Sequence, residues 1–343
     1  MSGEMQVGRL ALFILILFGI ALVSVGVWPF NFWSYFSNFA LLLASWFVFV
    51  SAESLVDLAR SRPDAPLAHF RSHVFSPTFR KRLNESWPIL IVSIFFLPTF
   101  STMKSAIPLF TTYSWDQTFI DLDIALHGDD PWRILQQAIG HPIITATLSA
   151  LYQLWILLIY AGTVYFALYV GDRQLRVRYF ATYFAAWAVN GALLAILLAS
   201  VGPCFLQPFL GNNHYVDQMN YLFAANTSYP VMSLDVQQRL IDWHASGSTD
   251  LGRGISAMPS MHVSLAFLFF LATRKVSRKL GFVFFAYFVA IAVGSVHLAY
   301  HYAVDAYLAF AVTAVIWILC GAFGRLSRSV SDRPQSQPAA ARL

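Results

Sequence analysis

The sequence predicts an all-α fold in which about eight transmembrane helices form one polytopic membrane bundle. Hydrophobic residues make up 58% of the 343 residues and charged residues only 11%, whereas a soluble domain carries about 25% charged residues. The apolar residues form long runs, for example over residues 10–28 and 179–201. Runs of about 18 or more residues are typical of transmembrane helices. We therefore expect a membrane domain and no separate soluble domain.

Clusters of lysine and arginine alternate with pairs of these runs, within residues 60–82, 173–178, 274–279 and 325–342. Cytoplasmic loops carry an excess of Lys and Arg, so we expect all the clusters and both termini to be cytoplasmic. This rule explains the net charge of +5 without a nucleic-acid partner, which a basic protein can otherwise suggest. The helices are then expected at residues 10–28, 36–58, 87–107, 144–170, 179–200, 259–273, 281–298 and 300–321.

The same pattern divides the chain into three regions. Residues 1–86 form an N-terminal extension of two helices with a basic cytoplasmic loop. Residues 87–321 form the main membrane domain. Residues 322–343 are rich in Ser, Pro, Gln and Arg, and this composition predicts a disordered cytoplasmic tail.

Two long outer segments, residues 108–143 and 201–258, carry acidic and aromatic residues that suit the outer membrane interface. We expect residues 119–128 to lie on that surface as an amphipathic helix. Together the two segments are long enough to form a cap over a site at the outer face.

Two histidines are the main candidates for chemistry. His262 and His301 are separated by two predicted passes, which places both at the outer membrane face. Asp305 lies four residues after His301, on the same face of the last helix. A carboxylate in that position holds the tautomer of an imidazole and raises its basicity. Two imidazoles and a carboxylate at one membrane face indicate phosphoryl transfer on a lipid.

The residues before His262 are suited to an anion. Pro259 fits the first position of a helix, where its missing N–H costs nothing. The hydroxyl of Ser260 and the free N–H groups of the first turn would then face an anion. Gly252 and Gly254 permit a close approach of the backbone to a ligand.

Several other interpretations remain open at this level. The histidines could have no role beyond contact with lipid headgroups. They could also serve as a proton relay or a headgroup site in a transporter or lipid-binding protein. His297, His301 and Asp305 recur every four residues and could offer three metal ligands on one helix face. A Ser-His-Asp hydrolase is disfavoured because the sequence lacks a Gly-x-Ser-x-Gly elbow.

The segment 259–262, Pro-Ser-Met-His, followed by His301 and Asp305, resembles the last two signature motifs of the type 2 phosphatidic acid phosphatase superfamily, P-S-x-H and S-R-x5-H-x3-D. The resemblance implies a six-helix core within residues 87–321, an active site at the membrane surface, and no metal or other cofactor. It makes His301 the nucleophile, Asp305 its orienting group and His262 the acid for the leaving oxygen. It also assigns Ser260 to phosphate binding.

The chain departs from the family pattern at its cationic positions. The first motif, K-x6-R-P, is missing, because Arg62-Pro63 has Leu55 in the lysine position and lies on the cytoplasmic side. Gly294-Ser295 replaces the Ser-Arg of the last motif. A transferring phosphoryl group needs positive charge, and we expect Lys104 and Arg253 to supply it.

Looser similarity points to one branch of that superfamily. Residues 104–108, Trp115-Asp116, Leu122-Asp123 and 126–128 resemble the aureobasidin-resistance, inositol phosphorylceramide synthase-like branch, as do Gly202-Pro203 and residues 255–257. This branch implies transfer of a phospho-headgroup between lipids, with a phospholipid or polyprenyl phosphate as the substrate. The site would face a periplasm or an organelle lumen. The sequence does not define the oligomeric state.

Overall fold

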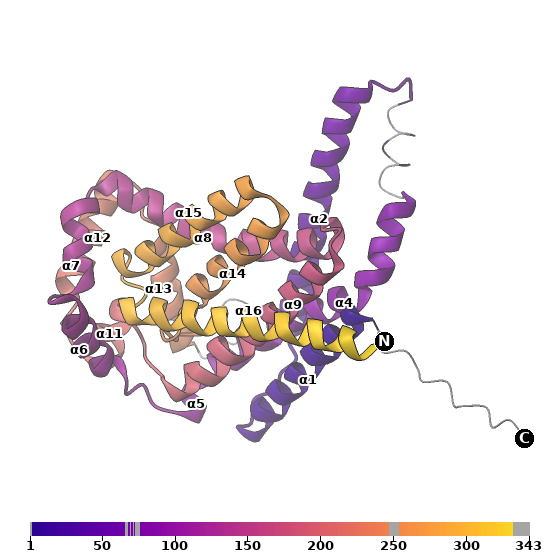
Figure 1. The fold of residues 1–343 in the computed structure, drawn as a ribbon. Helices are drawn as coiled ribbons and strands as arrows, with labels where there is room; N and C mark the ends of the chain where they lie inside the picture. Colours follow the sequence, from indigo (N-terminus) through magenta and orange to yellow (C-terminus); the bar gives the residue numbers. More distant parts are fainter. Residues whose placement is uncertain are drawn as a thin grey trace, which may run out of the picture.

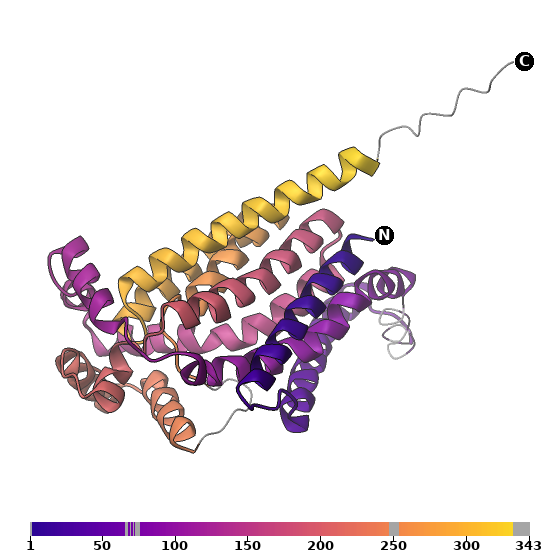
Figure 2. The same cartoon turned by 90° about the horizontal axis from the view of Figure 1, so that it is seen from below.

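The computed structural model of the chain describes residues 2–65, 68, 70, 72, 76–246 and 254–331, and within this part every regular element is a helix. The long helices are α1 Gly3–Ser24, α2 Phe32–Ser61, α4 Pro77–Ser105, α8 Pro142–Val164, α9 Arg173–Ala188, α14 Met261–Val276, α15 Arg278–His297 and α16 Ala303–Ser331. α8 continues in the π-helical η1 Tyr165–Tyr169. α9 continues in η2 Val189–Leu194 and α10 Ala195–Leu197. Most of the long helices run side by side, whereas α2 projects across the direction of α16 (Figure 1). α1 starts at the end of the bundle where α16 stops (Figure 2).

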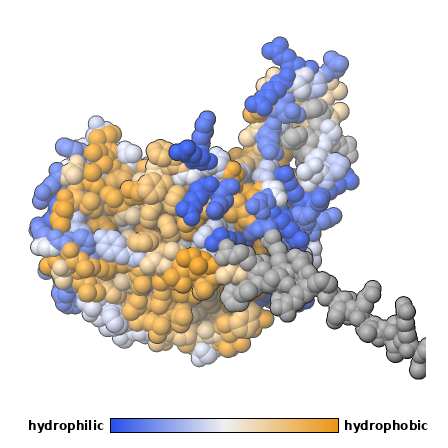
Figure 3. All heavy atoms as spheres, viewed as in Figure 1, coloured by the Kyte–Doolittle hydropathy of each residue, from blue (hydrophilic) through white to orange (hydrophobic). Residues whose placement is uncertain are grey.

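The predicted polytopic helical bundle is confirmed, because seven helices of the described part are long and apolar enough to cross a membrane. The eighth expected pass, α14, has 16 residues and falls short of the length of such a helix. α14 packs at the centre of the bundle against α9, α15 and α16. Its side chains Val263, Leu265, Ala266 and Leu268 are fully buried. An apolar band covers the bundle between hydrophilic ends (Figure 3).

Local capping explains where several helices begin. α4 starts at Pro77, ten residues before the expected start at 87, because the Ser76 side chain accepts the N–H of Phe79 and Pro77 suits the first turn. The apolar run marks only the part of α4 inside the membrane. The Asp172 side chain caps α9 by accepting the N–H groups of Gln174 and Leu175.

The N-terminal helix is part of the bundle. α1 packs against α4 and α9 through one buried face whose residues recur every three or four positions: Val7, Ala11, Ile14, Phe18 and Leu22. At the opposite end from the histidines, buried Glu4 accepts hydrogen bonds from Arg173 at 2.7 Å and Arg176 at 3.0 Å. Arg176 also pairs with Glu85 at 2.7 Å. This ion network ties three helices together.

Five shorter helices cover the other end of the bundle, and we call them the cap: α6 Asp116–His127, α7 Pro131–Ile139, α11 Pro203–Leu210, α12 Val216–Ser228 and α13 Met232–Ala245. They gather at one end of the long helices (Figures 1 and 2). α6 covers the expected surface helix up to His127, with Gly128 as its C-cap, but it also buries the carboxylates of Asp116 and Asp123. These carboxylates point inward because backbone N–H groups bind them, as described below.

The ion network at the end opposite the histidines yields a first prediction. Arg176→Met leaves Glu4 buried and removes one of its two arginine partners. Breaking a buried ion pair in this way lowers the unfolding free energy by about 3–5 kcal/mol. Arg173→Met is the comparison, because the Arg173 side chain is 53% exposed, so water screens its interaction with Glu4 and its loss should cost less. Thermal unfolding in detergent micelles should show a clearly larger fall in Tm for Arg176→Met. Equal falls would contradict this assignment.

Candidate active site

Three loop segments meet beneath the cap and carry the candidate residues: residues 199–202, 254–260 and 298–302. The last of these, between α15 and α16, is called the histidine turn. The Ala257 N–H donates to the Ser200 carbonyl at 3.0 Å, and the Cys204 N–H donates to the Ala299 carbonyl at 2.8 Å. Gly202 has a φ of +91°, and a Cβ at this position would lie 2.6 Å from the carbonyl oxygen of Tyr300. Only glycine permits this close approach.

His301 and Asp305 contact each other directly. α16 begins at Ala303 rather than at residue 300, so His301 precedes the helix and Asp305 lies in its first turn. The fully buried carboxylate of Asp305 accepts the Tyr302 N–H at 3.2 Å, and its Oδ2 is 3.1 Å from Nδ1 of His301. The expected contact therefore exists, but it is formed across a helix start and not along a helix face.

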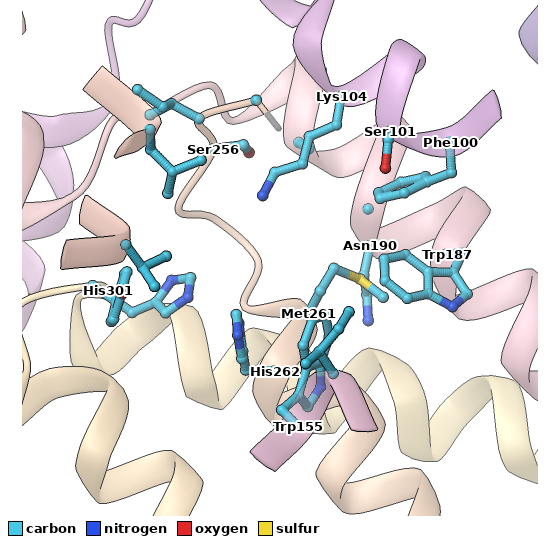
Figure 4. A pocket seen from close by; sticks show the side chains of 18 of the residues that line it. Phe100, Ser101, Lys104, Trp155, Trp187, Asn190, Ser256, Met261, His262 and His301 are labelled. Carbon is cyan, nitrogen blue, oxygen red and sulfur yellow. The ribbon is translucent and has the colours of Figure 1, made fainter. Parts of the chain in front are cut away.

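His262 is the second residue of α14 and faces His301, with 6.2 Å between the ring centroids. Its ring stacks on Tyr152 at 4.1 Å and on Trp155 at 4.0 Å, both on α8. These stacked contacts fix the plane of the imidazole. The structure thus brings together the two histidines that lie 39 positions apart in the chain (Figure 4).

Ser260 has a structural role that the sequence interpretation did not include. Its hydroxyl accepts the N–H of Val263 at 3.4 Å, which makes Ser260 the N-cap of α14. The helix therefore starts at Met261 and not at Pro259. Ser260 is fully buried, and it is not among the side chains that line the cavity between the histidines. Phosphate binding by Ser260 remains a prediction.

Lys104 lies in the last turn of α4 and lines the same cavity as His262 and His301. Its ammonium group points toward the space between the two rings (Figure 4). Gly254 has a φ of +97°, and a Cβ there would lie 2.8 Å from the Lys104 carbonyl carbon. This glycine therefore packs against the backbone of α4, and it also lines the cavity. Arg253, the second expected cation, lies outside the described residues.

The electrostatics of the histidine turn favour an uncharged His301. Burial lowers the pKa of its imidazole to about 3, and the nearby positive charge of Lys104 acts in the same direction. A lowered pKa means that the neutral form is present at every pH above that value. A neutral ring retains a nitrogen lone pair, which a nucleophile requires.

Two buried carboxylates of α6 hold the backbone around the site. Asp116 accepts the N–H groups of Val201 at 3.1 Å and Gly202 at 3.0 Å, and the hydroxyl of Tyr302 at 2.8 Å. Asp123 accepts the N–H groups of Ala303 at 2.8 Å and Val304 at 3.0 Å, which are the first of α16. Burial raises the pKa of Asp123, and these two donors oppose that rise. We call Asp116 and Asp123 the carboxylate clamp.

Side chains of the cap complete this support. Gln218 donates to the carbonyl of Val296 at 2.7 Å, and Gln237 donates to the carbonyl of Leu298 at 2.8 Å. The Tyr300 hydroxyl donates to the carbonyl of Ser233 at 3.1 Å. Each bond joins the cap to the histidine turn or to the end of α15, so the cap fixes the backbone that carries His301.

The interpretation of His297, His301 and Asp305 as metal ligands on one helix face does not fit this geometry. α15 ends at His297 and α16 begins at Ala303, so the three residues share no helix. Nε2 of His297 instead lies 2.8 Å from the Thr145 hydroxyl of α8. Within the described residues, no group of three His, Cys, Asp or Glu side chains is placed to hold a metal ion.

The missing arginine of the last family motif has no cationic replacement at its own position. Ser295 is buried, and its carbonyl accepts the N–H groups of Tyr300 and His301, both at 3.0 Å. Ser295 therefore shapes the histidine turn without adding charge. Positive charge near the rings comes from Lys104, on a different helix.

A comparison with known protein families assigns the chain to one of them. A family model described as the PAP2 superfamily matches residues 117–319, which is more than half of the chain. The chain belongs to the PAP2 superfamily. Membership supports a lipid phosphatase or phosphotransferase type of function, and the apolar helices indicate an integral multi-pass membrane protein. No curated protein and no solved structure matches the chain. The match to the family excludes α1, α2 and α4, so Lys104 lies outside it.

The carboxylate clamp yields the second prediction. Asp123→Asn keeps the size of the side chain but replaces one acceptor oxygen with a donor, so the start of α16 loses a hydrogen bond and His301 shifts. A small misplacement of a reacting group costs up to about a hundredfold in rate. We expect kcat of phosphate release or transfer to fall at least about tenfold, with little change in KM.

The matched control is Asp121→Asn, on the exposed face of the same helix, where the carboxylate contacts only Gln117 in the described structure. It should leave both kinetic constants unchanged. If Asp123→Asn changed KM and kcat no more than Asp121→Asn does, Asp123 would not be a positioning residue.

Proposed function

We propose that this protein is an integral-membrane lipid phosphotransferase of the inositol-phosphotransferase-like, aureobasidin-resistance type, or a lipid phosphatase, and that it acts through a phosphohistidine. The observation that carries the proposal is the position of the His301 ring, which contacts Asp305 and faces His262 across a cavity that Lys104 also lines. Family membership supports the general class of reaction. The branch is supported by sequence resemblance alone.

In the first half-reaction, the Asp305 carboxylate holds the Nδ1 proton of His301, so Nε2 carries the lone pair. Nε2 attacks the phosphorus of the lipid donor, and the bond from phosphorus to the leaving oxygen breaks. His262, whose charged form is favoured when the negative phosphate of the donor lies beside it, gives its proton to that oxygen. The charge that spreads over the phosphoryl oxygens is balanced by Lys104.

In the second half-reaction, an acceptor hydroxyl gives its proton to His262, and its oxygen attacks the phosphohistidine. The bond from phosphorus to Nε2 breaks, and both histidines return to their starting states. A water molecule as acceptor gives hydrolysis, whereas a lipid or polyol alcohol gives transfer. The cap covers the cavity with Phe205, Val236, Leu240 and Trp243, and an apolar cover favours an alcohol over water.

The orientation of the protein is also a proposal. The basic clusters at residues 173–178 and 274–279 lie at the opposite end of their helices from the cap. The excess of Lys and Arg at that end favours a cytoplasmic location for it. The site then faces a periplasm or an organelle lumen, with both termini in the cytoplasm.

The third prediction tests the nucleophile. Rapid-quench incubation with a phospholipid that carries a radioactive phosphate should trap an acid-labile phosphoprotein, and His301→Ala should abolish both the trapped label and turnover. His141→Ala, a change of an exposed histidine at the start of α8, should leave both intact. The same incubation with a panel of phospholipids distinguishes free phosphate from new lipid products.

Full turnover by His301→Ala would reject the mechanism. Binding of the phospholipid by the unchanged protein, without any covalent label or product, would instead favour a lipid-binding protein or transporter on the same scaffold.

The fourth prediction tests the cation. Lys104→Met removes the charge that stabilises the transferring phosphoryl group, and kcat/KM should fall on the order of a hundredfold or more. Lys104→Arg keeps the charge and should restore a large part of the activity. Lys81→Met, which changes an exposed lysine near the other end of α4, is the control. Equal activity of Lys104→Met and Lys81→Met would exclude Lys104 from the site.

A further inference from the structure

The cavity between the two histidines does not end at the polar site. It has a volume of about 310 Å³, comparable to pockets that bury a small ligand. At one end it is lined by Lys104, His262 and His301, and at the other end by apolar residues such as Leu97 and Ile159. A phosphate group alone would leave this apolar part empty.

The apolar part lies between α4 and α8. Lys104 and Leu97 are seven residues apart on α4, which corresponds to about 10 Å along the helix. Tyr152 and Tyr160 are eight residues apart on α8, or about 12 Å, and all four side chains line the cavity. The hydrocarbon core of a bilayer is about 30 Å thick, so the cavity extends from the polar site into one leaflet.

A buried polar group lies next to the apolar end of this space. Asn38 of α2 is fully buried and donates to the carbonyls of Ser93 at 3.0 Å and Ile94 at 2.8 Å, both on α4. Its side-chain oxygen accepts the hydroxyl of Tyr160 at 3.0 Å. Asn38 thus links α4 to α8 through Tyr160, which itself lines the cavity.

The cavity also reaches the lipid-facing surface. Ile156 of α8 lines it and is nevertheless 42% exposed. Its neighbours Leu154 and Leu157 are exposed as well and do not line the cavity. An apolar side chain that is shared by the cavity wall and the apolar outer surface of a bundle marks an opening toward the hydrocarbon of the membrane.

We propose that the space between α4 and α8 is a binding site for one hydrocarbon chain of the lipid donor, which enters beside Ile156 and ends next to the Asn38–Tyr160 hydrogen bond. This inference rests on the proposed function, because it takes the phosphate of the same lipid to lie between His262 and His301. The apolar walls bind the chain by excluding water. Lys104, at the polar end of the cavity, is placed to bind the negative charge of the headgroup (Figure 4).

The test compares Ile156→Trp with Leu157→Trp. Tryptophan at position 156 narrows the opening, whereas tryptophan at position 157 points into the lipid, where a 59% exposed leucine lies. Phosphatidylinositol and phosphatidic acid are each assayed in a long-chain form and in a dibutyryl form. For Ile156→Trp, the ratio of kcat/KM for long-chain over dibutyryl substrate should fall at least about tenfold, the loss expected when a well-packed apolar contact is removed. Leu157→Trp should not change the ratio.

An unchanged ratio in Ile156→Trp would overturn the chain site while leaving the phosphohistidine mechanism intact. Equal losses for both chain lengths would do the same, since the variant would then act on the headgroup site alone.

A measurement without turnover separates this inference from the proposed function. The inactive variant His301→Ala is placed in phosphatidylcholine vesicles that contain phosphatidic acid with a diazirine in the middle of one acyl chain. Light should produce crosslinks to Leu97 and Ile159, and these should disappear when Ile156→Trp is added. Crosslinks confined to the exposed residues Leu154 and Leu157 would overturn the chain site, even if the enzyme proved active.

Discussion

The geometry of the site depends on hydrogen bonds that backbone N–H groups donate to buried carboxylates. Asp123 binds the first N–H groups of α16, and Asp116 binds residues 201–202 together with the Tyr302 hydroxyl. A carboxylate at a helix start satisfies donors that the helix leaves free, and it also interacts favourably with the helix dipole. Here the carboxylates come from a separate cap helix. They therefore fix both the position of α16 and the turn that carries His301.

This support explains how two imidazoles remain close inside an apolar bundle. His262 is held by stacking on Tyr152 and Trp155, and His301 is held by Asp305 and by the backbone of its own turn. Neither ring needs to move far to meet a phosphoryl group between them. A site fixed in advance in this way loses little free energy to reorganisation during the reaction. The cap thus holds the backbone of the histidine turn and lines the cavity with apolar side chains.

Topology made part of the site predictable from the sequence. Two hydrophobic runs separate His262 from His301, and long hydrophobic runs indicate membrane passes. An even number of passes predicts that both histidines lie at the same face. The clamp was not predictable, since Asp123 and Ala303 are 180 residues apart and no local pattern links them. The acidic residues of α6 were interpreted as surface charge. For Ser260 the motif identified the residue but not its structural role. Only the structure shows that its hydroxyl caps α14.

We propose that Nε2 of His301 carries the phosphoryl group during the reaction, opposite His262 and near Lys104. A structure of the protein with bound orthovanadate, which imitates a transferring phosphoryl group, tests it most directly. We expect a vanadium atom bonded to Nε2 of His301, with its oxygens facing His262 and Lys104. Vanadate bound elsewhere in the chain, or a His301 ring turned away from it, would rule out His301 as the nucleophile.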